Sequence, residues 1–113
     1  MKKISVLTLM TVTIFIFSNC HSAKKAAAPK FTYENNIQTL VISNCTPCHI
    51  PSKGGNKKAL DSYDSTKANI SEMIRRINLN PLDKGFMPFK HEKLSESTIA
   101  VFMQWKEQGM PLN

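Results

Sequence analysis

The chain has 113 residues, with 15 basic and 8 acidic side chains and a formal net charge of +7. Five of the basic residues precede residue 31, so residues 31–113 are nearly balanced in charge, and no basic stripe interleaved with aromatic residues occurs in them. The composition therefore argues against a nucleic-acid partner, and the length allows one small domain.

The N-terminal segment has the layout of an export signal. Lys2 and Lys3 precede an apolar stretch over residues 4–17, and Cys20 follows it. This order predicts a signal peptide over residues 1–19, and a cysteine at its end resembles a bacterial lipobox. We therefore expect a lipidated Cys20, a tether over residues 20–30, and a domain anchored by lipid on the periplasmic side of a bacterial membrane. Cleavage elsewhere or an uncleaved helix are the alternatives, and both also place the domain outside the cytoplasm.

The first helix of the domain is expected to begin near Thr32. Tyr33, Ile37 and Val41 fall on one face at helical spacing, and the pattern runs directly into Cys45. A helix that ends at this cysteine would present the next residues on its last turn.

The sequence Cys-Thr-Pro-Cys-His at residues 45–49 is the covalent attachment signature of a c-type haem. Thiols three positions apart on a helical turn point the same way, so Cys45 and Cys48 can each bond one haem vinyl group. His49 is then held under the iron and can act as its proximal ligand. The motif predicts one covalent haem c.

Two other kinds of site contain part of this motif, a redox-active dithiol and a zinc site. A thioredoxin-like dithiol needs a surrounding pattern of strands and helices, which this sequence does not show. A zinc site needs four ligands, and beyond Cys45, Cys48 and His49 only His91 remains in the domain. The two cysteines could also merely pack in an ordinary domain.

Two further helices are expected. Apolar residues from Ile70 to Ile77 follow the i, i+3, i+4, i+7 pattern, and this helix should end before Pro81. The last helix starts after Ser95 as N-cap and stops at Gly109. The predicted fold class is all-α, a small bundle of three main helices over residues 31–113 wrapped around the haem.

The segments between the helices contain most of the remaining candidate iron ligands. Residues 51–56 are read as a flexible excursion, and residues 80–89 as a loop rich in breakers and apolar side chains. Met87 in this loop is the predicted distal iron ligand, because a thioether can bind iron on the face opposite His49. His91 and Met110 are the rivals that remain open, and Met110 lies at a terminus that is expected to fray.

The chain resembles small bacterial monohaem c-type cytochromes of the class I-like fold, especially the short planctomycete-type cytochrome c domains. The resemblance covers nearly all of residues 31–113. It rests on the motif at residues 45–49, the Met87-Pro88 pair and the closing helix that contains Trp105. Ile50 departs from it, because many relatives have glycine after the histidine.

The expected function is electron transfer and not catalysis. With His49 and Met87 both bound to iron, no coordination position is left for a substrate, so the protein is expected to be a monomeric relay that binds redox partner proteins transiently. The alternatives are a five-coordinate haem enzyme or sensor for peroxide or a small gas, and a lipoprotein without haem that only docks partners.

Overall fold

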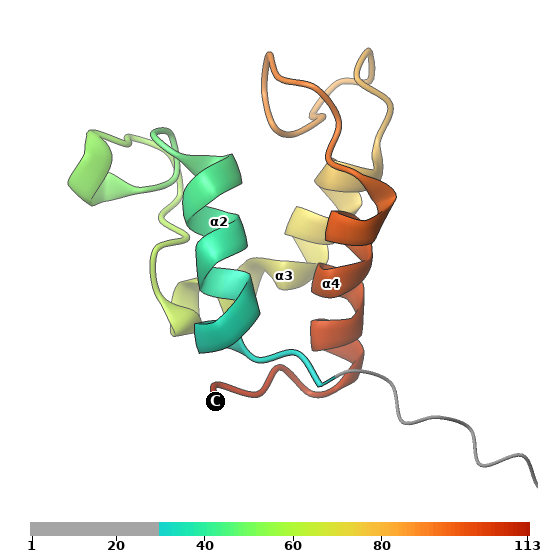
Figure 1. Cartoon of the computed structure of the whole chain (residues 1–113). Coiled ribbons are helices and arrows are strands. Elements are labelled where there is room, and N and C mark those ends of the chain that lie inside the picture. Colours follow the sequence, from blue (N-terminus) through green and yellow to red (C-terminus); the bar gives the residue numbers. More distant parts are fainter. Residues whose placement is uncertain (1–29) are drawn as a thin grey trace, which may run out of the picture.

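The computed structural model describes residues 30–113, and every regular element in that range is helical (Figure 1). In chain order the elements are a π-helical turn η1 (Tyr33–Ile37), α2 (Gln38–Cys45), a 3₁₀ turn η2 (Pro51–Lys53), α3 (Tyr63–Asn78) and α4 (Glu96–Glu107). The predicted all-α class with three main helices is confirmed.

Hydroxyl side chains begin the helices. Thr32 caps η1, which continues without a break into α2, and Ser95 caps α4. Ser62 caps α3 in a reciprocal arrangement with Ser65, in which each side chain accepts a hydrogen bond from the other's backbone N–H. Gly109, at a φ of 84°, ends the last helix. The helix starts predicted at Thr32 and Ser95 and the stop at Gly109 are therefore confirmed.

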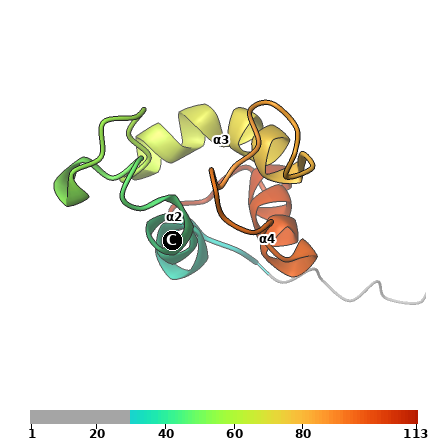
Figure 2. The same ribbon diagram turned by 90° about the horizontal axis from the view of Figure 1, so that it is seen from above.

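The helices enclose one apolar core. Helices α2 and α4 stand on the same side of α3 (Figure 1, Figure 2), and α4 packs against both α3 and η1. The buried side chains of this core come from η1, α2, α3, α4 and the α2–α3 connection: Tyr33, Ile37, Val41, Ile50, Leu60, Ile70, Ile77, Ile99, Phe102 and Trp105. The helical stripes seen in the sequence are thus core faces.

The C-terminal segment is fixed, so the prediction that it frays is wrong. The indole Nε1–H of Trp105 donates to the carbonyl of Pro111 at 2.9 Å, and the hydroxyl of Tyr63 donates to the carbonyl of Met110 at 2.9 Å. The backbone N–H of Tyr33 also donates to Pro111, at 3.0 Å. Buried polar groups need partners, and the chain end supplies the acceptors for these aromatic residues.

Residues 1–29 lie outside the described part, and with them the predicted signal peptide, Cys20 and nearly all of the tether. Between residues 30 and 113, no helix has the length and apolar character needed to cross a membrane.

Candidate functional site

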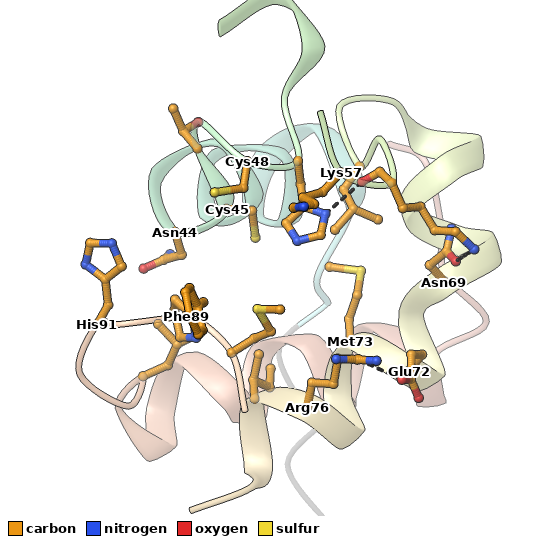
Figure 3. Close-up of a pocket in the computed structure, with 18 of the residues that line it drawn as sticks. Asn44, Cys45, Cys48, Lys57, Asn69, Glu72, Met73, Arg76, Phe89 and His91 are labelled. Atoms are coloured by element: carbon orange, nitrogen blue, oxygen red, sulfur yellow. Dashed lines mark hydrogen bonds and ion pairs between the residues drawn. The ribbon is translucent and has the colours of Figure 1, made fainter. Parts of the chain in front are cut away.

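A cavity of about 770 Å³ separates the end of α2 and the loop after it from α3 and the segment that precedes α4 (Figure 3). Most of its wall is apolar. The apolar side chains that line it are Pro47, Leu60, Met73, Ile77, Met87, Pro88, Phe89, Leu94 and Phe102. A space of this size and character suits a large apolar group.

The two cysteines of the motif lie in the same wall. Helix α2 ends at Cys45, and the next turn is closed by a hydrogen bond from the N–H of His49 to the carbonyl of Cys45 at 3.0 Å. Figure 3 shows Cys45 and Cys48 on one side of the cavity and Met73 on the other. Both cysteines carry free thiols, with Cys45 half-buried and Cys48 exposed. Both thiols line the cavity, but the prediction that they share a helical turn is wrong, because Thr46 is extended and ends α2 before Cys48.

The imidazole of His49 also faces the cavity, and its hydrogen bond defines the tautomer. Its Nδ1 lies 2.7 Å from the carbonyl oxygen of Lys58. A carbonyl can only accept, so Nδ1–H donates, and in the neutral ring Nε2 keeps its lone pair. Metal-binding histidines are usually held this way, by a second ring nitrogen that donates to a carbonyl or carboxylate. His49 is therefore prepared to bind a metal through Nε2.

The connection after the motif is a closed turn, and the prediction of a flexible excursion over residues 51–56 is wrong. The N–H of Lys57 donates to the carbonyl of Cys48 at 3.0 Å, and the N–H of Leu60 donates to that of His49 at 2.9 Å. Gly55 allows this close approach, because a Cβ at that position would collide with three backbone carbonyl oxygens. These bonds also place the acceptor of the His49 imidazole.

Three candidate ligands for the face opposite His49 line the cavity. Met87 is half-buried, as is Met73 from α3, while His91 is exposed. From the sequence, Met73 was expected only to pack in the core. It lies four residues before Ile77 and therefore on the same helical face, and both side chains line the cavity. Met110 is not among the lining residues and packs against the core, so it is not a candidate for this cavity.

Ile50, which departs from the resemblance, is buried in the core and is not among the cavity-lining residues. Its carbonyl accepts hydrogen bonds from the N–H groups of Lys53 at 2.9 Å and Gly55 at 3.1 Å. The Ile50 side chain packs in the core, while its carbonyl holds the turn that follows it.

Burial sets the state of one thiol. Loss of solvent raises the pKa of Cys45 to about 11, because a thiolate is poorly stabilised in an apolar environment. Cys45 is therefore a neutral thiol near pH 7 and a weak nucleophile until a base or a bonding partner acts on it.

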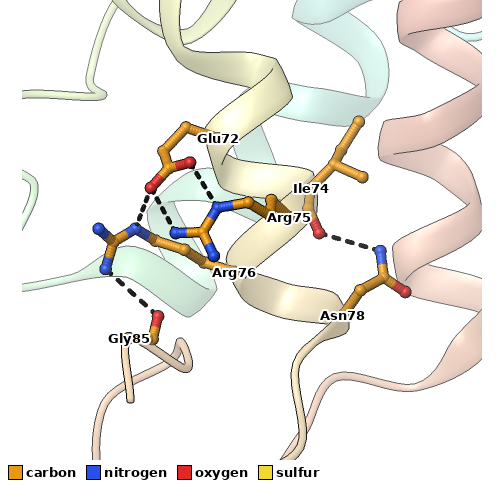
Figure 4. Close-up of polar contacts among 6 residues, drawn as sticks. All are labelled: Glu72, Ile74, Arg75, Arg76, Asn78 and Gly85. Carbon is orange, nitrogen blue, oxygen red and sulfur yellow. Dashed lines mark hydrogen bonds and ion pairs between the residues drawn. The ribbon is translucent and has the colours of Figure 1, made fainter. Parts of the chain in front are cut away.

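Glu72 and Arg76 of α3 lie at one edge of the cavity (Figure 3), and Figure 4 shows the polar contacts around them. Glu72 accepts hydrogen bonds from Nε of Arg75 at 2.7 Å, from Nη2 of Arg75 at 2.8 Å and from Nε of Arg76 at 2.7 Å. These bonds lower the pKa of Glu72 to about 2. A second bond runs from Nη1 of Arg76 to the carbonyl of Gly85 at 3.2 Å. Sequence reasoning did not identify this cluster, since nothing in the sequence shows which arginine faces the loop.

No family model, curated protein or solved structure matches the chain.

A zinc site needs four donors, and between residues 30 and 113 no three side chains of His, Cys, Asp and Glu gather closely enough to hold a metal ion. The strands that a thioredoxin-like site requires do not occur in that range either.

Proposed function

We propose that this protein is a monohaem c-type cytochrome that relays electrons between partner proteins. The observation that carries the proposal is the convergence of Cys45, Cys48 and His49 on one wall of the apolar cavity, with Nε2 of the imidazole free to bind. Two thiols and an imidazole at this spacing are the donor set of a c-type haem.

The cavity supports the proposal through its size and chemistry. Its volume of about 770 Å³ and apolar wall suit a large flat porphyrin. Cys45 and Cys48 supply the sulfurs for two thioether bonds, and His49 supplies the proximal nitrogen. Met87 lines the cavity and would supply a thioether as the second protein ligand of the iron.

The bound haem supplies a one-electron iron couple, and a methionine ligand raises its potential. The protein chain contributes the orientation of the ligands and the exclusion of water. His49 is oriented by the carbonyl of Lys58, and the apolar wall excludes water, which also tunes the potential. Two protein ligands leave no position for a substrate, so the function is that of a carrier and not of an enzyme.

Location and partners complete the proposal. Residues 1–19 are removed as a signal peptide, Cys20 is lipidated, and the domain acts on the periplasmic side of a bacterial membrane. Its partners are redox proteins that bind transiently. Mass spectrometry of the mature protein tests both modifications, because it gives the haem mass on the peptide that contains Cys45 and the acyl mass on Cys20.

The experiment for the haem is expression in a host that assembles c-type cytochromes. We expect a haem stain on a denaturing gel and a low-spin spectrum with the weak near-infrared band of methionine bound to ferric iron. Met87→Ala should lose that band, whereas Met73→Ala, the matched control from the same cavity, should keep it.

Other outcomes would contradict the proposal at different points. A colourless protein at polypeptide mass leaves no haem and favours a lipoprotein that docks partners. A high-spin spectrum with rapid binding of small ligands favours an enzyme or sensor. Loss of the band in Met73→Ala alone moves the distal ligand from the loop to α3.

A further inference from the structure

The loop that carries Met87 is a turn with its own internal hydrogen bonds. The backbone N–H of Asn80 donates to the carboxylate of Asp83 at 2.9 Å, and the N–H of Asp83 donates to the carbonyl of Asn80 at 2.9 Å. The N–H of Phe86 donates back to the carbonyl of Asp83 at 3.1 Å. Because the loop is bonded to itself, its contacts with α3 decide where Met87 lies.

Arg76 bonds this loop at two points, one through its backbone and one through its side chain. Its carbonyl accepts from the N–H of Met87 at 3.3 Å, and also from the N–H of Leu79, the residue that caps α3, at 3.3 Å. Its guanidinium donates through Nη1 to the carbonyl of Gly85 at 3.2 Å (Figure 4). The backbone bond reaches Met87 itself, and the guanidinium bond, the one that depends on the arginine side chain, reaches a residue two positions before it.

The guanidinium is held in place from the other side. Nε of Arg76 donates to Glu72 at 2.7 Å, one turn earlier on α3. Gly85 leaves room for it, because a Cβ there would lie 3.3 Å from Nη1 of Arg76. The planar donor fork of arginine can bond Glu72 and the loop at the same time.

We propose that Arg76 is a positioning residue for the distal iron ligand: bridged between Glu72 and the carbonyl of Gly85, it holds the loop so that Met87 stays directed into the cavity. This inference rests on the proposed function, in which Met87 binds iron. When the bridge is lost, the thioether leaves the iron more often and an external ligand takes its place more quickly.

The test compares two holoprotein variants, Arg76→Gln and Arg75→Gln. Arg75 is the matched control: it shares Glu72 with Arg76, and within the described residues it bonds no part of the loop. The readouts are the near-infrared methionine–iron band and the rate at which added imidazole replaces the thioether on ferric iron. We expect Arg76→Gln to raise that rate about tenfold, the size expected for one charge-assisted hydrogen bond, and Arg75→Gln to leave it within about twofold.

A second variant acts from the loop. Gly85→Ala places a methyl group against the guanidinium, and Gly109→Ala is its control, because Gly109 also has a positive φ but has no neighbour within 4 Å of the added Cβ. Gly85→Ala should speed imidazole binding and Gly109→Ala should not. If Arg76→Gln does not fold, the comparison of Gly85→Ala with Gly109→Ala tests the positioning role of Arg76.

The outcomes separate this inference from the function on which it rests. A parent protein without the methionine–iron band overturns both. A parent that has the band, with Arg76→Gln and Arg75→Gln exchanging ligand at the same rate, overturns only the role of Arg76.

Discussion

Replacement of Gly55 by alanine tests whether the turn after the motif is packed as tightly as the structure has it. A Cβ at this position meets the carbonyl oxygen of Pro47 and lies 2.7 Å from that of Cys48 and 2.8 Å from that of Ile50, whereas ordinary contact begins near 3.4 Å. All three atoms belong to the backbone. Relief therefore requires the turn itself to open.

The cost follows from these contacts. Overpacking in a tight site costs about 1–3 kcal/mol, and opening the turn strains two hydrogen bonds worth about 1 kcal/mol each. Those bonds run from Gly55 to Ile50 at 3.1 Å and from Lys57 to Cys48 at 3.0 Å. We expect Gly55→Ala to lower the free energy of unfolding by about 3 kcal/mol, which in a domain of this size lowers Tm by more than about 12 °C.

Urea and thermal unfolding of the holoprotein measure the effect, with Gly54→Ala as the control. Gly54 has a φ of 84° and no neighbour within 4 Å of an added Cβ, so its variant should lose only about 1 kcal/mol from the left-handed conformation. Covalent haem attachment should also fall in Gly55→Ala, because the distorted turn carries Cys48. If Gly55→Ala is no less stable than Gly54→Ala, the close packing of this turn is refuted.

Three further predictions follow from the core, the chain end and the α3 cluster. Replacing Cys45 and Cys48 together by alanine should leave a chain without fixed packing, because the apolar wall of the cavity would then face water instead of a bound group. Near-ultraviolet circular dichroism should show the loss, and cooperative unfolding at the parent's temperature would contradict it. Trp105→Phe keeps a buried ring but removes the indole hydrogen bond to the carbonyl of Pro111, which keeps the N–H of Tyr33 as a donor. Urea unfolding should therefore show a loss of about 0.5–1.5 kcal/mol, and an unchanged midpoint would count against the fixed chain end. Two arginines lower the pKa of Glu72 from 4.5 to about 2, so its carboxylate stabilises the fold above pH 4.5 and this contribution is lost as the pH falls through about 2. The Tm difference between parent and Glu72→Gln should be small, because these ion pairs are exposed, and it should shrink over that pH range. A Tm difference that stays constant with pH would contradict the linkage.

The helices could be predicted because their signals are local. Thr32 and Ser95 act as caps through residues three positions later, and Gly109 ends α4 through its own φ. The start of α3 was less well defined in the sequence, since its cap depends on the reciprocal bonds of Ser62 and Ser65, and serine also occurs in ordinary turns.

The candidate site was predictable only in part. Cys45, Cys48 and His49 lie within five residues of one another, so a single tight turn after α2 brings them to the same wall. Met73 could not be separated from ordinary core residues, because its helical face packs on the core along one part and lines the cavity along another. Arg76 was missed because its partner Gly85 lies in a loop nine residues away.

The sequence by itself determined the helical class, most helix ends and the close spacing of the two thiols and the imidazole, since each depends on residues near one another in the chain. Only the tertiary structure decided that the chain end is bonded to Tyr33, Tyr63 and Trp105 and that Met110 lies outside the cavity. It also decided that Lys58 supplies the acceptor for the imidazole. These features depend on contacts between segments far apart in the chain or on the path of a loop, and neither is encoded in local spacing.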